Sequence, residues 1–278
     1  MTNFSSWPNV PNFGEGARTE RWSWGVAFLF FVVVGFLKFQ QYRYCQNQAF
    51  DLGIYVNVLW NTAHGRFFYL AIRGGENYLG AHFSPLLFAF APLVRLWPSP
   101  LPLALLQSAA LALAIPAVYR LAARASGQSS VGLGFALWFS VFPFLHHVSR
   151  FDFHEVALAV PLFFWLLESW EAKQFRRALW LASLVVLVRE DCVLYVAAGA
   201  IWGALLGDVQ NAKTRRSLWI LGIFSAIGFA VVMFVVMPRL ASGARPADFN
   251  YENLGGGERI GNSSLPPGPL VGSKSGSS

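Results

Sequence analysis

Five consecutive residues, Phe151-Asp152-Phe153-His154-Glu155, place three ionisable side chains within four positions, and long apolar runs flank them on both sides. A charge at the centre of a bilayer is costly, so such residues usually pair with one another or mark a functional site. Carboxylates act as general bases, and imidazoles carry protons or bind metals. We therefore expect this segment to lie at the water boundary of a membrane span and to form part of a site.

Three other stretches carry further candidates, namely Asp51, His82 and the triplet Arg189-Glu190-Asp191. We expect all of them on the same side of the membrane as Asp152, with Arg189 and Glu190 at or just below the surface. Convergence of four separate stretches on one side indicates a site more strongly than any one motif does.

The composition indicates a helical integral membrane protein. Apolar residues make up 55% of the 278 residues and charged residues 13%, against about 25% charged in an average soluble domain. The apolar residues occur in long blocks, whereas membrane barrels show short alternating segments. The net charge of +7 comes largely from basic clusters at the ends of apolar runs, which is an orientation signal. No nucleic-acid-binding motif accompanies them, so we expect no nucleic-acid partner.

The hydropathy blocks divide the chain into a polar cytoplasmic N-terminus (1–21), a transmembrane core (22–238) and a Gly/Pro/Ser-rich tail (239–278) that we expect to be largely disordered. We expect about seven transmembrane helices. They fall at 22–39, 101–121, 131–146, 156–170, in two short helices within 178–206, and at 218–237, where Pro238 ends the last one.

The first outer loop is expected to carry two interfacial helices. The first covers 50–64, with Phe50, Ile54, Val58 and Leu59 toward one face, and stops at Gly65. The second covers 85–97, and this segment has two possible placements, an interfacial helix or a short membrane span. The interfacial placement is favoured because it puts the basic clusters around Arg120, at 171–177 and at 213–216 on the inner side. A disulfide between Cys45 and Cys192 is left open.

Four motifs together carry a resemblance: residues 50–55 (FDLGIY), 77–85 (NYLGAHFSP), 151–155 (FDFHE) and 189–191 (RED). They look like a bacterial and archaeal family of predicted membrane proteins of unknown function (domain of unknown function 2079). That family resembles the GT-C glycosyltransferases, which transfer sugars from polyprenyl-phosphate donors. The resemblance implies a GT-C-like core. In this sequence Asp51, the two interfacial helices and the acidic motif from Asp152 to Glu155 are similar to the plan of the GT-C enzymes. It also implies the bacterial inner (cell) membrane. Family members are usually longer, with more spans and a soluble outer part.

The residue types suit this chemistry. Sugar transfer to a hydroxyl needs a base for the acceptor and stabilisation of the leaving phosphate. Asp51 is the expected base, and Arg150 or Arg189 matches phosphate geometry. The candidate catalytic residues are Asp51, Asp152 and Glu155; the candidate substrate-binding residues are His82, Arg150, His154, Arg189, Glu190 and Asp191; the candidate ligands of Mg²⁺ or Mn²⁺ are Asp152, His154 and Glu155.

Each candidate also has a structural alternative. Asp51 is equally suited to cap the helix that follows it. Asp152 is suited to cap the next span, with Glu155 three positions on completing a capping box. The Arg189–Asp191 triplet is suited to a self-neutralised turn. The alternative function is a catalytically inactive GT-C-derived structural or assembly subunit of a larger membrane protein complex. The expected partners are membrane lipid, with a polyprenyl-phosphate sugar for the enzyme or other membrane protein subunits for the assembly role.

Overall fold

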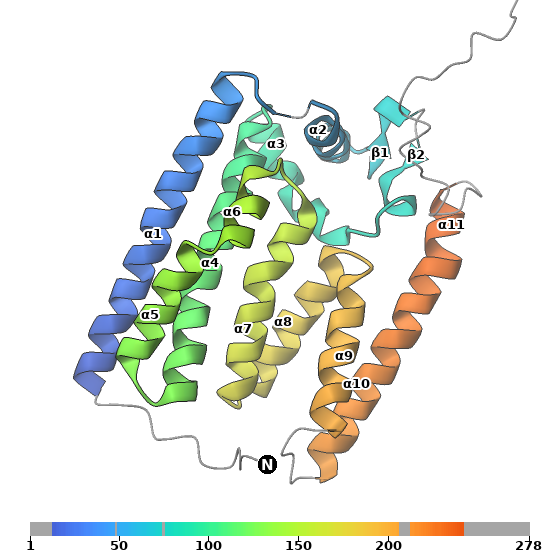
Figure 1. Ribbon diagram of the computed structural model, residues 1–278. Helices are drawn as coiled ribbons and strands as arrows, with labels where there is room; N and C mark the ends of the chain where they lie inside the picture. The colour runs from blue at the N-terminus through green and yellow to red at the C-terminus, as the bar shows by residue number, and fades with distance from the viewer. Residues whose placement is uncertain (1–12, 48, 74–75, 206–211, 242–278) are drawn as a thin grey trace, which may run out of the picture. The chain divides into compact units, whose positions relative to one another are not determined.

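The computed structural model describes residues 13–47, 49–73, 76–205 and 212–241, all within one compact unit of residues 1–246. Helices dominate these residues (Figure 1). The expected segments 1–21 and 239–278 lie largely outside the described residues, so the division of the chain into three parts stays a prediction. The larger helices are α1 (Phe13–Arg43), α4 (Leu101–Ser126), α5 (Ser129–Ser140), α6 (Pro143–Arg150), α7 (Ala159–Glu171), α8 (Phe175–Val188), α9 (Cys192–Leu205) and α10 (Ala212–Val231).

The helices pack around α4, which contacts α1, α5 and α7. From α7 the packing continues through α8 and α9 to α10. Long apolar sequence blocks give long helices here because a helix satisfies every backbone hydrogen bond within its own segment. The expected all-α class is therefore confirmed.

Three helices in the described part of the chain are long and apolar enough to cross a membrane: Gly16–Arg43, Leu101–Ser126 and Thr214–Leu240. The pair α5 and α6, bent by 43°, makes a fourth if it is one span. Helices α7, α8 and α9 have 13, 14 and 14 residues. That is about 20 Å of helix, shorter than the hydrocarbon core of about 30 Å. The structure thus shows an all-α membrane protein with three to four candidate spans, and the count of seven is not confirmed.

Exposed apolar side chains on α1 and α10 agree with a membrane environment. Phe28 on α1 is 68% exposed and Phe224 on α10 is 70% exposed. In water such an apolar surface would be unfavourable, whereas lipid accommodates it at no cost.

Helix α1 begins at Phe13, nine residues before the expected start at residue 22. The polar first turns are held by the end of α4. The Tyr119 hydroxyl lies 2.6 Å from the Thr19 hydroxyl and 3.2 Å from the carbonyl of Gly16, and Arg120 pairs with Glu20. These tertiary contacts continue the helix beyond the apolar block that hydropathy detects.

A compact group of short elements covers one end of the helices (Figure 1). It consists of α2 (Ala49–Ala63), β1 (Tyr69–Leu70), η1 (Ala71–Arg73), β2 (Glu76–Asn77), η2 (Tyr78–Gly80), η3 (Pro85–Phe90) and α3 (Ala91–Leu96). The strands are antiparallel, with Tyr69 opposite Asn77 and Leu70 opposite Glu76. Elements η3 and α3 together are shorter than a span and pack beside α2, as expected for the interfacial placement.

The buried face of α2 agrees with the expected one only in part. Val58 and Leu59 are buried as expected, whereas Phe50 is exposed and Tyr55 is buried in its place. The helix is rotated because Tyr55 packs edge-on against Phe153, with ring centroids 5.1 Å apart. The stop after α2 is confirmed: Gly65 has φ +83°, the left-handed conformation that glycine adopts without strain.

The last helix does not end at Pro238. A π-helical turn, η5 (Val232–Val236), links α10 to α11 (Met237–Leu240), and Pro238 lies in the first turn of α11. Proline has no N–H and its ring clashes with the carbonyl four residues earlier, so a wider turn before it lets the helix continue.

The two ends of the bundle differ in character. The loop end carries residues 44–47, 49–73, 76–100, 151–158 and 189–191 (Figure 1). The basic end carries Glu168 of α7, whose carboxylate is held by arginines of α4 and α8: Arg124 at 3.2 Å, Arg177 at 3.3 Å and Arg120 at 3.8 Å. Two of the three basic clusters that the sequence places on one side therefore meet at the basic end.

Candidate functional site

Glu155 is the most deeply buried carboxylate at the loop end, with 1% of its surface exposed. It opens η4 (Glu155–Leu158) and accepts hydrogen bonds from the hydroxyl of Tyr55 and, at 3.3 Å, from that of Ser84. Burial, together with the neighbouring Glu155 carboxylate, raises the pKa of Tyr55 well above its ordinary value. The expected motif 151–155 and the two interfacial helices are thus joined through a buried carboxylate and two neutral hydroxyls.

Glu190 makes the second connection. Its carboxylate accepts the backbone N–H of Phe83 at 2.7 Å and lies 3.3 Å from Nδ1 of His82. Burial lowers the pKa of His82, but the hydrogen bond to Glu190 and the nearby Glu155 outweigh burial and raise it above its ordinary value. The turn between α8 and α9 is therefore tied to the loop that follows η2.

The flanking charges of the triplet neutralise each other. Arg189 donates to Asp191 from Nε at 2.8 Å and also from its terminal nitrogen. Burial raises the pKa of Asp191, yet the bond from Arg189 lowers it below its ordinary value overall. The alternative of a self-neutralised turn thus describes Arg189 and Asp191, whereas Glu190 reaches across to another loop.

Asp152 is buried and contacts both the last turns of α1 and the segment that follows it. Its Oδ1 accepts from Asn47 Nδ2 at 2.5 Å and from Gln41 Nε2 at 3.5 Å. The residue at the cap position of η4 is His154, and its side chain makes no capping hydrogen bond. The expected capping box of Asp152 and Glu155 is therefore absent: both carboxylates bind groups from other parts of the chain.

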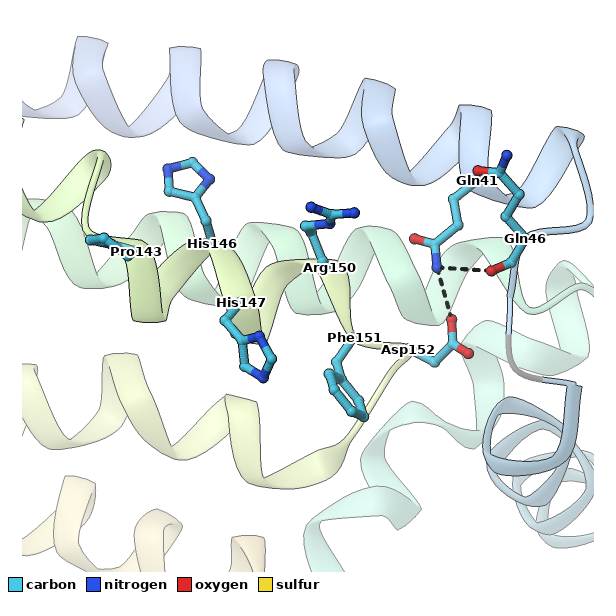
Figure 2. A pocket seen from close by; sticks show the side chains of 8 residues that line it. All are labelled: Gln41, Gln46, Pro143, His146, His147, Arg150, Phe151 and Asp152. Carbon is cyan, nitrogen blue, oxygen red and sulfur yellow. Dashed lines mark hydrogen bonds between the residues drawn. The ribbon is translucent and has the colours of Figure 1, made fainter.

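A pocket of about 570 Å³ lies between the end of α1 and helix α6 (Figure 2). In Figure 2, His146 and Arg150 project from α6 toward α1, and Asp152 points toward Gln41. The lining residues of the pocket are Gln41, Gln46, Pro143, His146, His147, Arg150, Phe151 and Asp152.

Asp51 and His154 stand apart from this pocket. Asp51 lies in the first turn of α2, one turn before Tyr55 on the same helix face, and is not at the cap position itself. His154 places Nδ1 3.0 Å from the carbonyl of Asp152 and its ring against Tyr55, 5.7 Å away. The loop end thus gathers all the candidates, but the pocket includes only Asp152 and Arg150 of them.

Metal binding finds no support in this arrangement. In the described part of the chain, no group of three or more His, Cys, Asp or Glu side chains is placed to hold a metal ion. The expected ligands point to separate partners: Asp152 to Asn47, His154 to a backbone carbonyl, and Glu155 to Tyr55. The two cysteines are unpaired, with Cys45 exposed and Cys192 buried.

A family model described as "Predicted membrane protein (DUF2079)" matches residues 43–266. The chain belongs to this family. The matched range includes all four motifs of the family resemblance and most of the described helices. No curated protein and no solved structure matches the chain. Membership of the family establishes a predicted membrane protein and assigns no reaction.

Two residues at the site escape the sequence analysis. Lys38 of α1 and Gln107 of α4 are almost fully buried, and both donate to the carbonyl of Phe151. A signal existed for each, because Lys38 lies in the expected span 22–39 and Gln107 in the expected span 101–121. Polar groups within spans usually face a partner.

Proposed function

We propose that the protein transfers a sugar from a polyprenyl-phosphate donor to an acceptor hydroxyl, in the pocket beside Asp152. The observation that carries this proposal is the presence of Arg150 and Asp152 in one pocket of about 570 Å³ at the loop end. A guanidinium binds phosphate oxygens, and a carboxylate accepts the hydrogen bond of an attacking hydroxyl.

In the proposed reaction the acceptor oxygen attacks the anomeric carbon of the sugar. The bond from that carbon to the phosphate oxygen breaks, and the electron pair leaves with the lipid phosphate, next to Arg150. The acceptor proton passes to Asp152. The nearby glutamine amides and the ring of Phe151 offer hydrogen bonds and a stacking surface to a sugar.

Catalytic roles for Asp51 and Glu155 stay predictions. Asp51 lies outside the pocket lining, and Glu155 accepts hydrogen bonds from two hydroxyls. We also propose a GT-C-like core, an outer-facing loop end, a cytoplasmic N-terminus and the bacterial inner membrane. The exposed apolar face of the helices and the membership of a membrane protein family support a membrane location.

Transfer from a radiolabelled polyprenyl-phosphate sugar by the purified chain in lipid vesicles tests the proposal. We expect Asp152→Asn and Arg150→Gln to lower the rate by about a hundredfold or more, the usual loss for a base or a charged transition-state contact. Asp51→Asn, assayed beside them, decides which carboxylate is the base. Transfer that is insensitive to both pocket variants would overturn the site.

A structural or assembly subunit is the second candidate, because buried charges at the loop end have partners within the chain. Glu190 binds His82 and Phe83, and Asp191 binds Arg189. Gentle purification from native membranes tests this function. Co-purification of a stoichiometric membrane partner, with no transfer by the chain alone or by that complex, supports the subunit.

A further inference from the structure

Lys38 lies near the end of α1, within the membrane-spanning stretch, and only 2% of it is exposed. Its ammonium group donates to three acceptors: the carbonyl of Arg150 at 3.0 Å, the carbonyl of Phe151, and Gln41 Oε1 at 3.2 Å. A cation among the last carbonyls of α6 is favourable because the C-terminus of a helix carries partial negative charge. The backbone of Arg150, whose side chain lines the pocket, is thus fixed from α1.

Gln107 holds the same segment from α4. Its Nε2 donates to the carbonyls of Val148 and Phe151, at 3.0 and 3.2 Å. Its Oε1 accepts the backbone N–H of His154 at 2.8 Å. The Gln107 side chain therefore hydrogen-bonds the backbone on both sides of Asp152. The carbonyl of Phe151 accepts hydrogen bonds from two different helices, α1 and α4.

Lys38 also sets the orientation of Gln41. An ammonium only donates, so the oxygen of the Gln41 amide faces Lys38 and its nitrogen faces Asp152. Reversing the amide would place N–H groups against the ammonium. Lys38 thereby makes Gln41 present a hydrogen-bond donor to the carboxylate of Asp152 in the pocket. Figure 2 shows the bond between Gln41 and Asp152.

We infer that Lys38 and Gln107 are positioning residues, which hold the segment from Arg150 to His154 so that Arg150 and Asp152 share one pocket. This inference deepens the proposed transferase function and rests on it for its catalytic consequence. Neither side chain is among the residues that line the pocket. Lys38 acts through Gln41 and the backbone carbonyls, and Gln107 through the backbone alone.

The experiment uses the full chain in vesicles, with Lys38→Met, Lys38→Arg and Gln107→Leu. Lys173→Met and Gln128→Leu are the matched controls, since both replaced side chains are exposed, in the connections α7–α8 and α4–α5. Hydrogen exchange of the amides in residues 148–155 reports the geometry without any substrate. Thermal unfolding and the KM and kcat of sugar transfer are measured in parallel.

We expect exchange in residues 148–155 to rise about tenfold in Lys38→Met and Gln107→Leu, the effect of one lost hydrogen bond to a charged or buried group. The kcat of sugar transfer should fall about tenfold, with the KM for the lipid-linked donor changing less, because the misplaced Arg150 and Asp152 act in the transition state. Lys38→Arg should restore both the exchange and kcat in part, because arginine keeps the positive charge although its planar guanidinium presents its donors differently. The controls should match the wild type.

Unchanged exchange in both Lys38→Met and Gln107→Leu would overturn the positioning role. A uniform fall in melting temperature and faster exchange throughout the chain, without rescue by Lys38→Arg, would also overturn it. A wild type with no transfer, together with faster exchange confined to residues 148–155 in the variants, would remove the transferase function and leave the positioning role supported. If Lys38→Met does not fold, Gln107→Leu tests the same carbonyl from α4.

Discussion

At the scale of single residues, the loop end shows that an ionisable side chain can serve packing and chemistry together. Glu155 is buried and accepts hydrogen bonds from two hydroxyls, and in the described part of the chain it forms no ion pair. Such an acceptor depends strongly on each donor, because an unsatisfied buried charge is expensive.

Tyr55→Phe should therefore destabilise the protein by about 1–3 kcal/mol, since it removes one of two donors to a buried carboxylate. The measurement is thermal or denaturant unfolding in detergent. Tyr195→Phe is the control, because that ring is 58% exposed on α9. Equal stability of the two variants would show that the Tyr55–Glu155 bond contributes little.

The pair His82–Glu190 should make stability depend on pH. The pKa of His82 is higher in the folded chain than its ordinary value of 6.5. A raised pKa means that the folded state binds the proton more tightly, so the stabilisation is complete below about pH 6.5 and is lost as the pH rises through the folded pKa. The melting temperature of the wild type should thus fall relative to His82→Gln as the pH rises above about 6.5. Parallel curves would contradict this.

At the scale of elements, small residues decide where the loop end meets the helices. A Cβ on Gly80 would lie 2.5 Å from the backbone nitrogen of Ala241, at the end of α11. Gly53 of α2 has no atom within 4 Å of the same position. The two glycines therefore form a matched pair for one substitution.

Gly80→Ala should lower the free energy of unfolding by about 1–3 kcal/mol, because the contact between η2 and α11 must open. Gly53→Ala should be neutral or should stabilise by up to about 1 kcal/mol, since alanine favours a helix interior. Unfolding in detergent measures both. Equal effects would show that η2 does not dock on α11.

The basic end joins α4, α7 and α8 through Glu168, only 1% of which is exposed. Glu168→Gln removes the charge that the three arginines share. We expect the free energy of unfolding to fall by about 3 kcal/mol, because the arginines are partly exposed and can be hydrated. Glu20→Gln, at a pair that is one-third exposed, should cost about 0–1 kcal/mol. A smaller loss for Glu168→Gln than for Glu20→Gln would contradict the central role of Glu168.

Individual residues show which parts of the fold and of the candidate site the sequence predicts. Hydropathy locates the helices, and Gly65 locates the end of α2, because both depend on local properties. The buried face of α2, the partners of Glu155 and the roles of Lys38 and Gln107 depend on contacts about 40 to 110 residues apart. The π turn before Pro238 escapes prediction because proline alone indicates only that a regular helix is disturbed.

At the scale of the whole molecule, the ends of the bundle predict an orientation. The basic end should face the cytoplasm because short loops rich in Lys and Arg stay inside. Cys45 at the loop end is exposed, while Cys192 is buried. The exposed thiol of Cys45 can thus report which side of the membrane the loop end faces.

A membrane-impermeant maleimide should therefore label Cys45 in intact cells, and Cys45→Ser should abolish the labelling. The readout is the mass shift of the purified protein. Labelling that appears only after the membrane is opened would reverse the orientation and place the pocket beside Asp152 in the cytoplasm.

The arginines around Glu168 also have a consequence for biogenesis. Translation makes Arg120 and Arg124 before Glu168, and Arg177 follows it by nine residues. The carboxylate leaves the ribosome when two of its counterions already exist, so α7 can enter the lipid against a finished α4. A ribosome paused once α7 has left its exit tunnel should then already hold a protease-resistant fragment that contains α1, α4 and α7.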